Sequence, residues 1–285
     1  DDTLSGGAGN DTIDGSSGSD TLSYATLNSA VDVDLVAATA SNDGEGGSDT
    51  LISIENVFGS SANDTIKGDA NANTLSGNDG DDNLEGGAGD DYIDGGSGTD
   101  FVNYSTATQG VDINLETTTV TNDGFGDSDT LVSIENILGS SHQDTIIGSS
   151  SDNVLEGKAE IDTLKGGAGD DTLDGGADSD QLFGGSGDDT LLGGTGTDTA
   201  NYSEASGSIT ASLTGSTGSV SDGDAGTDTL DSIENIIGSD SADIISATTG
   251  INTLSGGDGA DTIDAGAGDD TMQGDAGNDL FVGTQ

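Results

Sequence analysis

Acidic side chains recur through this chain at a fixed spacing, and they are the residues best suited to chemistry. Asp and Glu number 55, against 3 Lys and Arg, so the formal net charge is −52. Carboxylate oxygens are hard ligands of the kind that Ca²⁺ prefers. The chain has no Cys and only His142, so it lacks the ligand set that zinc or copper would need. The residue types therefore predict calcium binding.

The acidic positions fall at every ninth residue within three long blocks. The positions, occupied by Asp, Glu or Asn, are Glu55, Asp64, Asn73, Asp82, Asp91 and Asp100, then Glu135, Asp144, Asn153, Asp162, Asp171, Asp180, Asp189 and Asp198, then Glu234, Asp243, Asn252, Asp261, Asp270 and Asp279. An apolar residue follows two positions after each, as at Ile66 and Leu75. Such regularity indicates a solenoid in which every repeat has the same structure.

Composition sets the limits within which this solenoid must fold. Only 29% of residues are hydrophobic and 3% aromatic, whereas 50 are Gly. A chain with so little apolar material and so much charge is expected to stay disordered unless cations offset the repulsion. The negative charge also argues against nucleic acid or anionic lipid as a partner. No apolar run approaches the ~20 residues needed to span a bilayer.

Each nonapeptide has the form G-G-x-G-x-D-x-U-x, in which U is apolar, as in Gly6–Asp14. Six Gly-rich residues suit a turn whose backbone angles a side chain would forbid. The three residues that follow suit a short strand with U pointing inward. One apolar residue in nine predicts a thin core, a column of Leu, Ile and Val between two narrow sheets.

At these residues the chain resembles the RTX, or hemolysin-type, calcium-binding repeat family, over roughly two-thirds of its length. The resemblance implies an all-β, right-handed parallel β-roll in which two nonapeptides form one coil. It also implies several Ca²⁺ ions, each between a turn and the turn one coil later. The first turn would supply the carbonyls of its positions two and four and its Asp side chain. The later turn would supply the carbonyls of its positions one and three and its own Asp side chain.

Carried over residue by residue, the resemblance implies four complete sites. They are Gly167, Gly169 and Asp171 with Gly184, Ser186 and Asp189; Gly176, Asp178 and Asp180 with Gly193, Thr195 and Asp198; Asn78, Gly80 and Asp82 with Gly95, Ser97 and Asp100; and Gly257, Gly259 and Asp261 with Gly274, Ala276 and Asp279. The same pattern implies further ligands at Asp2, Gly15, Ser17, Asp20, Asp64, Gly77, Asp79, Gly86, Ala88, Asp91, Asp162, Gly175, Ala177, Asp243, Gly256 and Asp258.

Several turns depart from the pattern. Asn73, Asn153 and Asn252 stand where Asp is expected, so we expect weak or empty sites there, or a ladder of Asn side chains without metal. Glu55 and its two equivalents lie in Ser-Ile-Glu-Asn segments that lack Gly, and there we expect no site of the standard type.

Three homologous inserts, residues 24–54, 104–134 and 202–233, interrupt the repeat blocks 1–23, 55–103, 135–201 and 234–285. Each carries alternating apolar residues typical of a strand. One reading is a loop or hairpin that buds off the roll. The spacing from Leu22 to Val57, 35 residues, is close to four half-turns of nine and favours two further, degenerate coils. On that reading 1–285 is one continuous array of about sixteen coils, a rod of ~75–80 Å at a strand spacing of ~4.7–4.9 Å.

Each insert also holds one acidic hexamer: Gly44–Asp49, Gly124–Asp129 and Gly223–Asp228. Asp49 precedes Asp64 by fifteen residues rather than eighteen, so an ion shared by these two would sit in a shortened coil. An acidic loop without metal is the alternative, and the sequence leaves both open.

The functional prediction follows from the repeat. Paired carboxylates recur with the period, so metal ligation or a solvated face explains them better than catalysis, and we expect no enzyme activity in this chain.

Since the sequence opens in the middle of a repeat, we expect a segment of a longer protein with neighbouring domains. The block duplication favours a secreted or cell-surface bacterial spacer, as in an adhesin or an S-layer-like protein, exported by type I secretion as the resemblance implies. The alternatives are the secretion and folding module of an RTX enzyme or toxin, and ice binding, which the irregular third turn positions disfavour.

Overall fold

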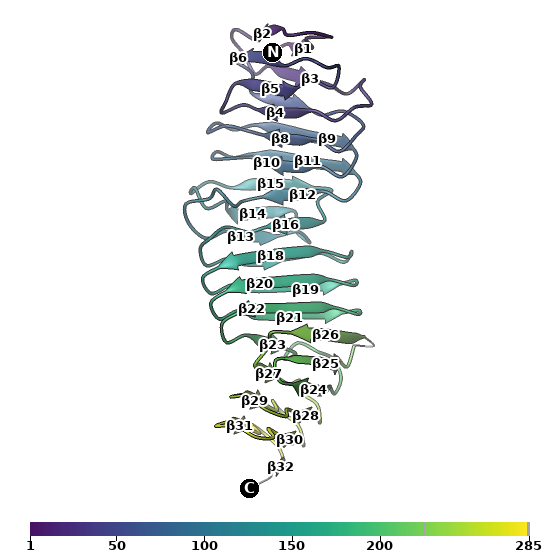
Figure 1. Ribbon diagram of the computed structural model, residues 1–285, viewed down its shortest axis with the longest axis vertical. Coiled ribbons are helices and arrows are strands. Elements are labelled where there is room, and N and C mark those ends of the chain that lie inside the picture. The colour runs from purple at the N-terminus through teal and green to yellow at the C-terminus, as the bar shows by residue number, and fades with distance from the viewer. Residues whose placement is uncertain (225, 284–285) are drawn as a thin grey trace. The chain divides into compact units, whose positions relative to one another are not determined.

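The computed structural model describes residues 1–224 and 226–283. The chain divides into two compact units, Asp1–Ser140 and Ser141–Gln285. All regular elements of the described residues are β-strands (Figure 1), most of them three to six residues long. Among those residues there is no helix that is long and apolar enough to cross a membrane.

Unit 1 consists of two sheets, 1a and 1b. In spatial order, sheet 1a contains β1 (Thr3–Leu4), β3 (Thr21–Ser23), β7 (Asn56–Phe58), β9 (Thr74–Asp79), β11 (Tyr92–Ser97), β15 (Asp129–Val132), β14 (Thr119–Asn122) and β13 (Asp112–Asn114). Sheet 1b contains β2 (Thr12–Asp14), β6 (Asp49–Ile52), β5 (Thr39–Asn42), β4 (Asp32–Asp34), β8 (Thr65–Lys67), β10 (Asn83–Glu85), β12 (Phe101–Asn103) and β16 (Asn136–Leu138).

Unit 2 is built in the same way from sheets 2a and 2b. Sheet 2a contains β17 (Thr145–Ile147), β19 (Thr163–Ala168), β21 (Gln181–Ser186), β23 (Thr199–Asn201), β27 (Asn235–Ile237), β29 (Thr253–Ser255) and β31 (Thr271–Gln273). Sheet 2b contains β18 (Val154–Ala159), β20 (Thr172–Ala177), β22 (Thr190–Thr195), β26 (Thr227–Asp231), β25 (Thr217–Ser221), β24 (Thr210–Thr214), β28 (Ile244–Ser246), β30 (Thr262–Asp264) and β32 (Leu280–Val282).

Within the repeat blocks, strands one coil apart pair in parallel with a shift of eighteen residues. Leu164 lies opposite Leu182 in sheet 2a, and Leu173 lies opposite Leu191 in sheet 2b. All four side chains are fully buried, because each strand turns its central apolar residue toward the other sheet. The predicted β-roll, with its thin column of Leu, Ile and Val, is thus confirmed. Its handedness and the single array over 1–285 stay predictions.

The sheets pass through each insert as expected, but the insert is not two extra coils. Leu22 pairs directly with Val57, so the 35 residues between them form one enlarged coil. The insert strands β4, β5 and β6 form an antiparallel meander within sheet 1b, between β2 and β8. The second insert forms the same meander in sheet 1a, and the third forms one in sheet 2b. The budding-loop reading is also wrong, since these strands are hydrogen-bonded members of the sheets.

The direction reverses because the insert carries a hairpin turn that the repeat lacks. Ala38 adopts a left-handed φ of 57°, and the Asp34 carboxylate accepts the Ala37 N–H at 2.7 Å. In the second insert Thr118 has the same φ, and Asn114 Oδ1 accepts the Thr117 N–H. An Asx side chain that caps a turn replaces the Gly that usually marks one.

Candidate metal sites

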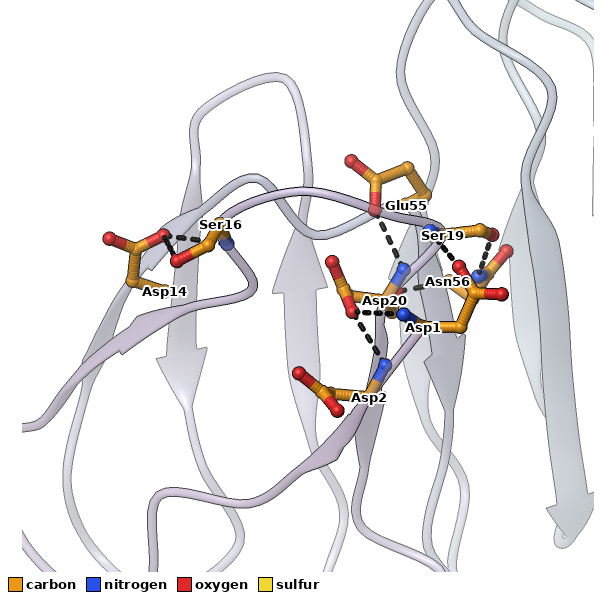
Figure 2. Close-up of polar contacts among 8 residues, drawn as sticks. All are labelled: Asp1, Asp2, Asp14, Ser16, Ser19, Asp20, Glu55 and Asn56. Atoms are coloured by element: carbon orange, nitrogen blue, oxygen red, sulfur yellow. Dashed lines mark hydrogen bonds and ion pairs between the residues drawn. The ribbon is translucent and has the colours of Figure 1, made fainter.

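The repeated Asp residues form ladders along the turns. At most of these turns one carboxylate oxygen, Oδ1, accepts the backbone N–H of the Asp or Asn eighteen positions earlier. The N–H groups of Asp64, Asp82 and Asp162 donate to Asp82, Asp100 and Asp180 at 2.7, 2.8 and 2.8 Å. Figure 2 shows one such ladder, in which Asp2 donates to Asp20 and Asp20 donates to Glu55. The ladder holds the carboxylates of successive coils in register.

The second carboxylate oxygen has no hydrogen-bond partner at most of these turns, although it is buried. This holds for Oδ2 of Asp11, Asp20, Asp82, Asp91, Asp100, Asp162, Asp171, Asp180, Asp189, Asp198 and Asp261. A buried carboxylate oxygen without a partner is costly unless a cation meets it. The pattern therefore fits the implied metal sites.

Burial raises the pKa of Asp162, Asp171 and Asp180 well above the ordinary Asp value of 3.8. The pKa rises to about 8 at Asp162, about 7 at Asp171 and about 6 at Asp180, and neighbouring carboxylates contribute to each rise. The cause is the loss of water around a charge, which only partly finds compensation in the ladder hydrogen bond. A bound cation would reverse this effect.

The first Gly of each turn makes room for the unpartnered oxygen. A Cβ atom at Gly95 would fall 2.5 Å from Asp100 Oδ2, and one at Gly184 would overlap Asp189 Oδ2. Neither glycine has a left-handed φ. Space for the carboxylate, rather than backbone freedom, thus explains Gly at this position.

Carbonyl groups of turn positions two and four lie close to the next coil. A Cβ at Gly194 would overlap the Gly176 carbonyl, and one at Gly196 would overlap that of Asp178. The position-one carbonyl of Gly184 lies toward the preceding coil, 2.5 Å from where a Cβ of Gly166 would be. The position-three carbonyl of Ser186 accepts the Gly169 N–H at 2.9 Å, and a carbonyl has a second lone pair.

The donors at these turns are all hard oxygens, as Ca²⁺ requires. In the described part of the chain no three Asp, Glu, His or Cys side chains surround one point as a metal cage. The implied site does not need such a cage, because it combines two carboxylates with backbone carbonyls. The four complete predicted sites have this arrangement, and their residues stay proposed ligands.

Two of the predicted ligand residues have carboxylates that are already satisfied. Ser60 donates its N–H to Asp64 Oδ2 at 2.5 Å and its hydroxyl to Oδ1 at 2.9 Å. Ser239 makes the same contacts with Asp243 at 2.7 and 2.9 Å. A Ser at turn position two therefore caps these turns from within, and it distinguishes them from the turns with a free oxygen.

The turns with Asn and Glu are also held by hydrogen bonds. Asn73 Nδ2 donates to the Glu55 carbonyl at 2.7 Å, and Asn252 Nδ2 donates to that of Glu234 at 2.7 Å. The Asn N–H group therefore satisfies this carbonyl, which in a standard site would be a ligand of the cation. The carboxylates of Glu55 and Glu234 accept the N–H of Asp20 and Asp198, so the Glu residues extend the ladder.

The insert hexamers lie elsewhere than the sequence suggested. Asp49 Oδ1 accepts the N–H of Asp11 at 2.8 Å, so Asp49 stacks on the first nonapeptide turn and not on Asp64. Of the two readings that the sequence left open for this hexamer, the one with an ion shared by Asp49 and Asp64 is not the stacking that this hydrogen bond shows. The residue before each hexamer, Asp43, Asp123 or Asp222, is buried and was missed, although its recurrence in all three inserts was a visible signal. Ala225 of the third hexamer lies outside the described residues.

Comparison with known families agrees with this geometry. A model of the RTX calcium-binding nonapeptide repeat matches residues 1–25, 54–82, 68–102, 135–164, 147–182, 165–200, 237–272 and 246–281, which together cover more than half of the chain. The chain belongs to the RTX calcium-binding nonapeptide repeat family. No curated protein matches it.

RTX repeats bind several Ca²⁺ ions, and they are structural calcium-binding modules rather than catalytic ones. The chain is therefore a calcium-binding repeat region of an RTX protein. Such repeats are typical of secreted bacterial proteins. The matched segments leave out residues 26–53, 103–134 and 201–236, which are nearly all of the first insert and all of the other two.

Proposed function

We propose that this chain is a calcium-stiffened spacer of a secreted or cell-surface bacterial RTX protein, which folds when it meets Ca²⁺ outside the cell. The observation that carries the proposal is the pairing across the inserts. Leu22 with Val57, Val102 with Ile137, and Ala200 with Ile236 are direct parallel neighbours. Each insert thus adds strands to a sheet without interrupting the stack in its unit, as an element that builds length would.

Stiffness in such a stack comes from contacts between neighbouring coils. Without cations, the net charge of −52 opposes compaction, and each Ca²⁺ offsets two charges. Extracellular calcium modules have dissociation constants of ~10⁻⁴–10⁻³ M, which matches the calcium available outside cells and not the low level in the cytosol. The chain would then be exported unfolded and stiffen afterwards.

The test is an end-to-end distance measured with and without calcium. The chain has no Cys, so Thr3→Cys and Leu280→Cys place two labels uniquely, in β1 and β32. If the whole chain forms the proposed single array of about sixteen coils, the labels would lie on the order of 75 Å apart at the usual strand spacing. A narrow distribution near this value in calcium supports the spacer, whereas a short or broad distribution in calcium contradicts it.

A further inference from the structure

The three inserts share a loop that begins and ends with a buried Asp. The loops run from Asp43 to Asp49, from Asp123 to Asp129 and from Asp222 to Asp228. The first Asp of each is at most 1% exposed. Its Oδ1 accepts loop N–H groups, from Gly47 at 2.8 Å in the first insert and from Gly226 at 2.9 Å in the third. One oxygen therefore closes the loop and leaves the other available.

The second Asp of each loop takes the place of the next repeat in a carboxylate ladder. The N–H groups of Asp11, Asp91 and Asp189 donate to Oδ1 of Asp49, Asp129 and Asp228, at 2.8, 3.0 and 3.1 Å respectively. Each insert loop thus stacks on a nonapeptide turn as a following turn would. Unlike a nonapeptide turn, it brings two carboxylates instead of one.

Buried carboxylate oxygens without a hydrogen-bond partner gather where loop and turn meet. In the first insert they are Oδ2 of Asp11, Asp43 and Asp49. In the second they belong to Asp91 and Asp123, and in the third to Asp189 and Asp222. The remaining oxygens, of Asp129 and Asp228, accept the hydroxyl groups of the buried Tyr104 and Tyr202 at 2.9 and 2.8 Å.

Backbone geometry places these oxygens beside a carbonyl of the nonapeptide turn. A Cβ at Gly47 would fall 2.5 Å from Asp43 Oδ2 and would overlap the Gly9 carbonyl. In the third insert a Cβ at Gly226 would fall 2.6 Å from Asp222 Oδ2 and would overlap the Gly187 carbonyl. Gly9 and Gly187 occupy turn position four, so the additional carboxylate meets the turn at one of its carbonyls.

We propose that each insert loop forms an additional Ca²⁺ site with the turn beneath it. The proposed ligands are the carboxylate pairs with a free buried oxygen, Asp11 with Asp43, Asp91 with Asp123 and Asp189 with Asp222. In the first and third inserts a carbonyl of the turn lies beside them. Two carboxylates and backbone carbonyls are oxygen ligands of the kind that Ca²⁺ takes. An ion at each site would fix the enlarged coil in place. The proposal rests on calcium binding by the repeats and goes beyond the spacer role.

The test removes only the additional charge. Asp43→Asn, Asp123→Asn and Asp222→Asn together keep the Oδ1 acceptor that closes each loop. A matched control, Asp32→Asn, Asp112→Asn and Asp231→Asn, removes three exposed charges from the same inserts. Equilibrium dialysis with radioactive calcium should show three fewer ions in the first variant and no change in the control. An unchanged ion count in the first variant overturns the proposal.

A second measurement does not depend on folding of that variant. A terbium ion bound near a tyrosine emits light when the tyrosine ring is excited. The chain has no Trp, and three of its four Tyr residues lie in the inserts. In a Tyr92→Phe background, terbium bound to the chain should therefore show tyrosine-excited emission. Bound terbium without such emission overturns the proposal. The end-to-end distance in calcium is read separately, so failure of the spacer role is distinguishable.

Discussion

At the scale of the residue, each repeated Asp has two oxygens with different roles. In the case of Asp180, Oδ1 accepts the Asp162 N–H at 2.8 Å, and Oδ2 is buried without a partner. The Oδ1 contact is structural and needs no metal, whereas the buried Oδ2 needs a cation as its partner. An Asn keeps one acceptor oxygen but brings no charge to the second role. Asn73 uses its oxygen within its own turn, where it accepts the Asp69 N–H at 2.8 Å.

Replacing Asp180 by Asn should therefore weaken calcium binding without breaking the ladder. Asp180 belongs to two successive proposed sites, so we expect the calcium concentration at half-folding to rise on the order of tenfold. The control is Asp178→Asn in the same turn, whose side chain is exposed and whose proposed ligand is the backbone carbonyl. Circular dichroism during calcium titration measures both variants. Equal midpoints for the two would refute the assignment of Asp180.

Low pH should replace calcium in part in stabilising the folded state. In the folded, ion-free chain the pKa of several buried Asp residues is raised above 3.8, to about 6 at Asp180, about 7 at Asp171 and about 8 at Asp162. A raised pKa means that protonation favours the folded state, so this stability is present at low pH and is lost as pH rises through about 6 to 8.

In calcium-free buffer we therefore expect β-structure below about pH 5 and its loss toward neutral pH. With calcium present the dependence reverses, because protons compete with the ion for the same oxygens. Far-UV circular dichroism across pH, with and without calcium, measures both trends. A calcium-free protein that gains structure as pH rises would contradict this account.

At the scale of the element, the insert strands behave as members of the sheets. Val33 in β4 is fully buried, and it pairs with Ile66 of β8. Val36, three residues further, is 65% exposed. The two Val residues are therefore a matched pair for testing whether the insert packs on the roll.

Val33→Ala should lower the free energy of unfolding in calcium by about 2 kcal/mol, because it leaves a cavity in the core column. Val36→Ala should change it by less than about 0.5 kcal/mol, as is usual for exposed positions. Urea unfolding at saturating calcium gives both values. If Val33→Ala proves as mild as Val36→Ala, the insert does not contribute to the core.

The nonapeptide elements could be predicted from the sequence because one short-range rule governs them. Gly-rich turns and a single inward residue fix the strand positions, and Leu164 opposite Leu182 follows from the eighteen-residue coil. The inserts could not be read in this way. Their strand pattern is the same in a parallel coil and in an antiparallel meander, and only the turn at Ala38 decides the direction.

Part of each candidate site was equally hidden from the sequence. The repeat predicts which residue is acidic, but it does not show that Ser60 already satisfies Asp64. The stacking of Asp49 on Asp11, 38 residues away, depends on how the enlarged coil returns. Asp43 gains importance only through that contact, because it brings the insert loop onto the turn of Asp11.

At the scale of the whole molecule, the fold has little stability of its own. The core is one apolar residue per half-turn, and the net charge of −52 opposes compaction. Metal-binding free energy must therefore be folding free energy, as in other small-core metal proteins. On the proposed function, the same dependence would leave the chain unfolded where calcium is scarce and folded where it is abundant.

The most direct test is the far-UV circular dichroism of the chain at neutral pH, first in excess chelator and then through a calcium titration. The account predicts a disordered spectrum in chelator and one cooperative gain of β-structure at ~10⁻⁴–10⁻³ M Ca²⁺. An equal concentration of Mg²⁺ should not replace it, because Mg²⁺ demands a tight octahedron and keeps its waters. A full β-spectrum in chelator, unchanged by calcium, would contradict the central claim that these carboxylates fold the roll by binding the ion.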